Sequence, residues 1–174
     1  MNQSLRQVAI DPVSPLPTRQ VFHNADDARE ATYEVARSAR RSLCLFTQDL
    51  EPDVYDRIEF LDIVKNLVLT HKFARVRILI KHPVTSDRHA TRLVEMSRRF
   101  SSFLEIRQIH ADAAQRRDAF LLADQSGVMY RTDARRHEGI ADTRSAAVTI
   151  GYLEFFDTLW DKSETARELR LLHL

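Results

Sequence analysis

Apolar residues recur along the chain at two alternating spacings, and this alternation predicts an α/β protein. Residues 42–47 and 76–80 are short, nearly continuous apolar runs, which are typical of strands covered on both faces of a sheet. Next to them, apolar residues such as Val54, Ile58 and Leu61 repeat at the spacing of an amphipathic helix. Strands that alternate with helices favour parallel βαβ units with right-handed crossovers.

The N-terminal part of the chain is predicted to precede the fold. Residues 1 to about 18 contain three prolines without sustained periodicity, so we expect a flexible leader, followed by one domain over residues 19–174. Residues 21–23 suit a short edge strand. Asn24 suits the N-cap of a helix whose apolar stripe contains alanines and a valine.

The second half of the chain predicts the remaining strands of a mixed sheet. Residues 103–109 alternate like a half-buried strand, and residues 116–131 contain two apolar runs that a short turn with Gly127 joins into an antiparallel pair. A polar, arginine-rich loop is expected from there to about residue 145. The last firm element is a helix with one apolar face, formed by Ile150, Leu153, Phe156 and Trp160. Together these elements predict an α/β sandwich, a mixed sheet flanked by helices.

This order of elements, over roughly residues 21–163, resembles one half-unit of the phospholipase D-like superfamily. The stretches FTQDLEPDVYD at 46–56 and ELRLLHL at 168–174 also resemble an uncharacterised group of proteobacterial proteins of this kind. The resemblance implies a pocket where two His-x-Lys-x4-Asp motifs meet, contributed by two half-units or by two subunits. One histidine attacks phosphorus, the other protonates the leaving oxygen, and the lysines hold phosphate oxygens. A homodimer follows as an expectation from this architecture.

The motif of the superfamily is degenerate in this chain. Counting back from Asp124 places Ala119 at the lysine position and Arg117 at the histidine position. A guanidinium stays protonated at ordinary pH, so Arg117 offers no nucleophile. We therefore expect a non-catalytic phospholipase D-like module, a pseudoenzyme that binds an anionic ligand or a protein partner.

Topology brings charged residues to one edge of the predicted sheet. In open α/β sheets, ligands bind beyond the carboxyl ends of the strands. Predicted anion-binding residues there are Lys81, Arg117, Arg131, Arg135 and Arg136, and predicted cleft-lining residues are Asp49, His82 and Asp133. The alternative is a solvated loop whose arginines pair locally with Asp112, Asp118, Asp133 and Glu138.

A hydrolase with relocated residues is the competing hypothesis for this edge. His110 or His137 could act as general base of a phosphodiesterase or nuclease, paired with Asp49 or Asp124. More often such histidines are exposed polar surface, and Asp124 would then only cap the turn before Gly127. A third hypothesis is an interaction domain whose leucine-rich ending, residues 167–174, docks on a partner or packs on the core.

Composition narrows the classes of partner. The net charge of +1 indicates no global attraction to nucleic acid, although nucleic acid stays possible through local clustering. Aromatic residues such as Tyr33, Phe60 and Phe73 do not alternate with basic ones along the sequence, as a single-strand stacking platform would require. The only cysteine, Cys44, excludes a disulfide framework and a cysteine zinc site. No histidine spacing indicates a metal, no motif indicates a cofactor, and no apolar run approaches transmembrane length, so a cytoplasmic protein is expected.

Overall fold

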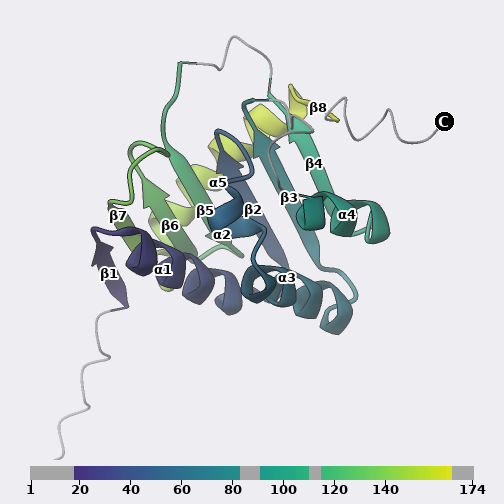
Figure 1. The fold of residues 1–174 in the computed structure, drawn as a ribbon, viewed down its shortest axis with the longest axis horizontal. Helices are drawn as coiled ribbons and strands as arrows, with labels where there is room; N and C mark the ends of the chain where they lie inside the picture. The colour runs from purple at the N-terminus through teal and green to yellow at the C-terminus, as the bar shows by residue number, and fades with distance from the viewer. Residues whose placement is uncertain (1–17, 83–90, 110–114, 166–174) are drawn as a thin grey trace, which may run out of the picture.

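The chain folds into an eight-stranded mixed sheet with helices on both faces (Figure 1). The computed structural model describes residues 18–82, 91–109 and 115–165. The strands lie in the order β1-β7-β6-β5-β2-β3-β4-β8. Their bounds are β1 Arg19–Phe22, β2 Ser42–Thr47, β3 Arg75–Ile80, β4 Leu104–Gln108, β5 Ala119–Ala123, β6 Gly127–Arg131, β7 Gly139–Asp142 and β8 Glu164–Thr165. The predicted α/β fold with a mixed sheet is confirmed, while the predicted leader and the C-terminal tail from residue 167 lie outside the described residues.

Three neighbouring strands of the sheet, β2, β3 and β4, are parallel. β2 pairs with β3, and β3 with β4, all in the same direction. On its other side β2 pairs antiparallel with β5, which forms the predicted antiparallel hairpin with β6. As a result, the carboxyl ends of β2 and β3 and the start of β5 meet at one edge of the sheet, the upper edge in Figure 1.

The helices are distributed unevenly over the two faces. Their bounds are α1 Ala25–Ser38, α2 Pro52–Tyr55, α3 Ile58–Thr70, α4 Thr91–Arg99 and α5 Ala146–Asp161. The first four cover one face, and α5 crosses the other (Figure 1). Asn24 caps α1 as predicted, because its side chain accepts a hydrogen bond of 2.9 Å from the backbone N–H of Asp27.

The helix predicted from Val54 onward is divided at Asp56 into α2 and α3. The buried carboxylate of Asp56 accepts a hydrogen bond of 2.9 Å from the backbone N–H of Leu93, in the first turn of α4, and lies 3.7 Å from Arg92. Asp56 thus satisfies an otherwise unpaired donor at the N-terminus of a helix 37 positions away. A pairing over this distance leaves no local signal in the sequence.

The loop predicted after Arg131 contains a strand instead. β7 pairs antiparallel with β6 and with β1. A Cβ atom at Gly139 would lie 2.2 Å from the carbonyl oxygen of Tyr130 and 2.6 Å from the ring of Phe22. The absence of a side chain there therefore permits the close approach between β7 and its neighbours.

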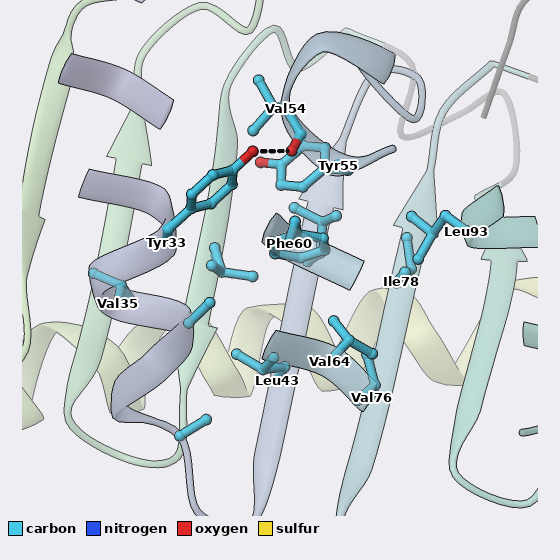
Figure 2. Packing of buried hydrophobic residues seen from close by; sticks show 14 of the residues in the cluster. Tyr33, Val35, Leu43, Val54, Tyr55, Phe60, Val64, Val76, Ile78 and Leu93 are labelled. Carbon is cyan, nitrogen blue, oxygen red and sulfur yellow. Dashed lines mark hydrogen bonds between the residues drawn. The ribbon is translucent and has the colours of Figure 1, made fainter. Parts of the chain in front are cut away.

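Both faces of the central strands are buried. On the α1–α4 face, Tyr33, Phe60 and Ile78 belong to one core, and the Tyr33 hydroxyl donates a hydrogen bond of 2.8 Å to the carbonyl oxygen of Val54 (Figure 2). On the α5 face, Phe120 and Phe156 belong to a second core. Burial on both faces explains the continuous apolar runs of β2 and β5.

Candidate anion-binding cleft

A cleft of about 290 Å³ lies at the edge where the carboxyl ends of β2 and β3 meet the start of β5. It is lined by Gln48, Asp49, Lys81, His82, Arg117, Asp133 and Arg135. The structure thus brings together six residues that the sequence placed at this edge. The seventh lining residue, Gln48, was not predicted from the sequence. It stands directly after a buried strand, one residue before Asp49, so the same topological argument would have included it.

Two side chains of the cleft hold the segment that leads into β5. The amide nitrogen of Gln48 donates hydrogen bonds of 3.3 Å and 3.2 Å to the carbonyl oxygens of Arg116 and Asp118. The ammonium of Lys81 donates to the same Arg116 carbonyl. In addition, the carbonyl oxygen of Arg117 accepts a hydrogen bond of 2.7 Å from the N–H of Ala134. The backbone of Arg117 is therefore fixed on several sides.

The charges of the cleft are only partly balanced. Asp133 and Arg135 form an ion pair of 3.1 Å, and hydrogen bonds from the side chain and backbone of Arg135 lower the pKa of Asp133 to about 2. Partial burial and the nearby positive charge of Arg117 lower the pKa of Lys81. The Arg117 side chain is exposed and makes no hydrogen bond or ion pair with any residue that the structure describes. The cleft consequently holds a guanidinium without a hydrogen-bond or ion-pair partner among the described residues, beside an ammonium.

Arg131 lies beneath this edge, outside the lining of the cleft. Its Nη2 atom donates to both carboxylate oxygens of Glu51, at 2.6 Å and 2.7 Å, and the Thr47 hydroxyl donates to the same carboxylate. Burial opposes the charge of Arg131, yet Tyr55 and Glu51 raise its pKa overall. Arg131 is thus already paired within the protein.

Ala119, at the lysine position of the motif, lies beneath this ion pair. It is the cross-strand partner of Arg131 and is completely buried. Alternation along β2 and β5 places Thr47 and Ala119 on the same face as Leu45 and Leu121. The bridge from Thr47 through Glu51 to Arg131 therefore passes over Ala119, where a longer side chain would need the same space.

The other candidates lie elsewhere. Asp124 is at the opposite edge of the sheet, where its carboxylate accepts hydrogen bonds of 2.8 Å each from the backbone N–H groups of Arg40, Arg41 and Ser42. Arg136 and His137 are exposed and do not line the cleft. His110 and Asp112 lie outside the described residues.

Arg116 has partners of its own beside the cleft. It forms an ion pair with Asp118, and its guanidinium stacks 4.2 Å from the ring centroid of Phe155. Arg116 and Arg135 thus pair locally with Asp118 and Asp133, as the alternative of a self-paired loop expected, whereas Arg117 pairs with neither of them and Asp112 lies outside the described residues. Among the described residues, no cluster of three or more histidine, cysteine or acidic side chains is arranged to hold a metal ion. Within the same residues, no helix is long and apolar enough to cross a membrane.

Comparison with solved structures confirms the predicted likeness to the phospholipase D fold. The structure is similar to Nuc of Salmonella typhimurium, a phospholipase D family member, with a TM-score of 0.56 and 17% identity over 86% of this chain and 97% of that one. NucT of Helicobacter pylori matches with a TM-score of 0.58 and 9% identity over 84% and 98% of the two chains.

An archaeal DNA-binding protein shares the same fold. TrmBL2, an archaeal chromatin protein whose structure shows a novel mode of DNA binding, matches with a TM-score of 0.62 and 16% identity over 90% of this chain. This chain spans 56% of the length of TrmBL2. No curated protein matches the sequence. Residues 24–172 match the family model described as "Domain of unknown function (DUF7931)".

Proposed function

Since the chain belongs to the DUF7931 family and has a phospholipase D-like fold, we propose that it is a non-catalytic module that binds a phosphate-bearing anion in the cleft at the β2–β3–β5 edge. The observation that supports this proposal is the guanidinium of Arg117, which no described residue pairs with, beside the ammonium of Lys81. Like charges that lie this close repel each other, and a bound anion relieves the repulsion.

The chemistry of the lining favours phosphate over a simple halide. A guanidinium presents a planar fork of donors that matches two oxygens of a phosphate, and an ammonium adds a third donor from another direction. Arg135 is held by Asp133, and Asp49 adds a negative charge at the rim. The site therefore suits one phosphate group better than a densely charged polyphosphate.

The loss of the histidine of the motif supports the non-catalytic part of the proposal. Arg117 occupies the histidine position of the motif, and a guanidinium does not attack phosphorus. The competing hydrolase needs His110 or His137 to reach the cleft, and His137 is not part of its lining. His82 does line the cleft, and its ring forms no hydrogen bond with any described residue.

The test is the thermal stability of the protein in inorganic phosphate, glycerol phosphate and a nucleoside monophosphate, compared with matched concentrations of chloride. We expect the phosphate compounds to raise the melting temperature of the wild type and of Arg136→Ala, a matched arginine outside the cleft lining. Arg117→Ala should lose that increase. An equal increase in all three proteins, or none in any, would contradict the proposal.

Hydrolysis of bis(p-nitrophenyl) phosphate that disappears in His110→Ala or His137→Ala would establish the hydrolase instead.

A further inference from the structure

A row of cations lies at the edge of the sheet opposite the cleft. There the C-terminal ends of α1, α3 and α4 meet the first residues of β2, β3 and β4, at the lower edge in Figure 1. The cations are Arg40, Arg41, Lys72, Arg75, Arg98 and Arg99, which we call the basic edge. All six are exposed. They come from three separate connections of the chain, so their convergence is a property of the fold.

Backbone hydrogen bonds place the parts of the basic edge side by side. The N–H of Arg75 donates to the carbonyl oxygen of Arg41 at 2.8 Å, and the N–H of Val76 donates to that of Phe103 at 2.7 Å. The N–H of Phe103 in turn donates to the carbonyl oxygen of Phe100, next to Arg99, at 2.8 Å. Neighbouring strands lie about 4.8 Å apart, so the starts of β2, β3 and β4 span about 10 Å.

The cations of the basic edge have no carboxylate partners among the described residues, in contrast to arginines elsewhere. Arg77, Arg107 and Arg116, for example, each form an ion pair with an aspartate or glutamate. The carboxylate of Asp124, which lies at this edge, is occupied by three backbone N–H groups. Asp124 still contributes one negative charge to this edge, but it forms no ion pair with any of the six cations.

Hydrogen bonds to the last carbonyl groups of helices do not account for most of these cations. Basic residues commonly follow helix C-termini because they hydrogen-bond the last carbonyl groups. Arg40 does so with the carbonyl oxygens of Arg37 and Ala39, both at 3.2 Å, and Arg75 bonds its neighbour Ala74 at 2.8 Å. The other four form no hydrogen bond or ion pair through their side chains with any described residue.

Aromatic rings are interleaved with the cations in space, although not in the sequence. Lys72 lies 5.6 Å from the ring centroid of Phe73, and Arg75 lies 5.8 Å from that of Phe103. Arg99 lies 5.8 Å from the ring centroid of Phe100. Phe73 is 76% exposed, which leaves its ring accessible for stacking. Cations along a surface with accessible aromatic rings are the features by which proteins bind single-stranded nucleic acids.

A groove beside Arg40 adds a place for a flat, partly polar group. It has a volume of about 520 Å³ and lies between the last turns of α1 and α3. Its lining combines the apolar Ala39, Ile63 and Leu67 with the polar Asn66 and His71. An apolar floor with hydrogen-bonding groups at the rim suits a nucleobase.

We propose that the basic edge binds single-stranded nucleic acid, with its cations on successive phosphates and a base stacked on Phe73. This site is separate from the cleft and goes beyond the function proposed for it. An anionic membrane is less favoured, because membrane-surface binding needs a broad apolar face that enters the lipid. The basic edge offers one strongly exposed ring, since Phe100 and Phe103 are half-buried against the core.

The test is the fluorescence anisotropy of a labelled twenty-nucleotide oligo-dT with the full chain, at several salt concentrations. The triple variant Arg41→Ala/Lys72→Ala/Arg99→Ala removes side chains without hydrogen bonds to described residues, so the fold should persist. We expect at least about tenfold weaker binding. The slope of log K against log[salt] should become shallower by about 2, because each cation that neutralises one phosphate contributes about 0.7 to it. Phe73→Ala should weaken binding about fivefold or more, and Phe73→Tyr should retain it.

A charge-matched control is the triple variant Arg57→Ala/Arg136→Ala/Lys162→Ala, whose cations are exposed and away from the basic edge. It should bind like the wild type. Equal losses in the two triple variants would overturn the proposal. If duplex DNA bound as tightly as oligo-dT and Phe73→Ala left the affinity for oligo-dT unchanged, the edge would not be specific for single strands. Sedimentation with phosphatidylglycerol vesicles, without oligonucleotide binding, would assign the edge to membranes instead.

Discussion

Arg131 and Glu51 form an ion pair over the strand position of Ala119, with Nη2 of Arg131 2.6 Å and 2.7 Å from the two carboxylate oxygens. The side chains are only 3% and 16% exposed. Glu51 also adopts a positive φ of 30°, which is uncommon for a residue with a side chain. Glu51 thus combines an uncommon backbone conformation with a buried ion pair, near the end of β2.

Loss of Glu51 should destabilise the protein strongly. Glu51→Ala leaves the buried guanidinium of Arg131 without its counter-charge, and the free energy of unfolding should fall by about 3 kcal/mol. Urea denaturation measures this loss. The double variant Glu51→Ala/Arg131→Met removes both charges and should be more stable than Glu51→Ala alone. A double variant as unstable as the single one would show that packing, not the unpaired charge, is the cause.

Restoring the motif should not restore catalysis. Arg117→His alone should fold, because the Arg117 side chain has no partner among the described residues. Adding Ala119→Lys places a long cation at a fully buried position under Arg131, and the free energy of unfolding should fall by about 3 kcal/mol or more. Urea denaturation and hydrolysis of bis(p-nitrophenyl) phosphate check both parts. A stable, active double variant would mean that this space is free.

Substitution of Asp124 should affect stability and leave the cleft unchanged. Asp124→Ala removes three hydrogen bonds to backbone N–H groups and should lower the free energy of unfolding by about 2 kcal/mol. Asp124→Asn retains an acceptor oxygen and tolerates the positive φ of 51° at this position, so its loss should be smaller. Phosphate should still raise the melting temperature of both variants. A variant that folds normally but no longer responds to phosphate would give Asp124 a role in binding.

Cys44 should be unreactive in the folded protein. Burial raises the pKa of its thiol to about 11, while the charge of Arg77 acts in the opposite direction. Little thiolate therefore exists at pH 8, and modification by a disulfide reagent should follow unfolding. Because the unfolded chain ionises first, stability should fall as the pH rises from about 9 to about 11. Rapid modification in native buffer would contradict the buried position.

The sequence placed several residues of the cleft lining at one edge because these residues follow strands that are buried on both faces. Apolar runs located the ends of β2 and β3, and topology then placed Asp49, Lys81 and His82 at one edge. What could not be predicted depends on contacts between distant residues. The pairing of Arg131 with Glu51 joins residues 80 positions apart, and nothing local distinguishes it from a free arginine.

Two strands escaped prediction for related reasons. β7 is four residues long and follows a polar loop, and its pairing depends on the small Gly139. β8 has two residues and exists through its pairing with β4. The basic edge was not predicted either. Its cations and aromatic rings lie on three helix-to-strand connections that are distant in the sequence and become neighbours only in the folded sheet.

The pairing of β1 with β7 also bears on how the chain is made. β1 ends at Phe22, and its partner among the described strands begins at Gly139. At translation speeds of about 5–20 residues per second, β1 waits on the order of ten seconds for that partner to leave the ribosome. Its unpaired edge during this interval is available to other nascent chains or chaperones. The first strand of the fold thus stays without this partner until more than a hundred further residues have been made.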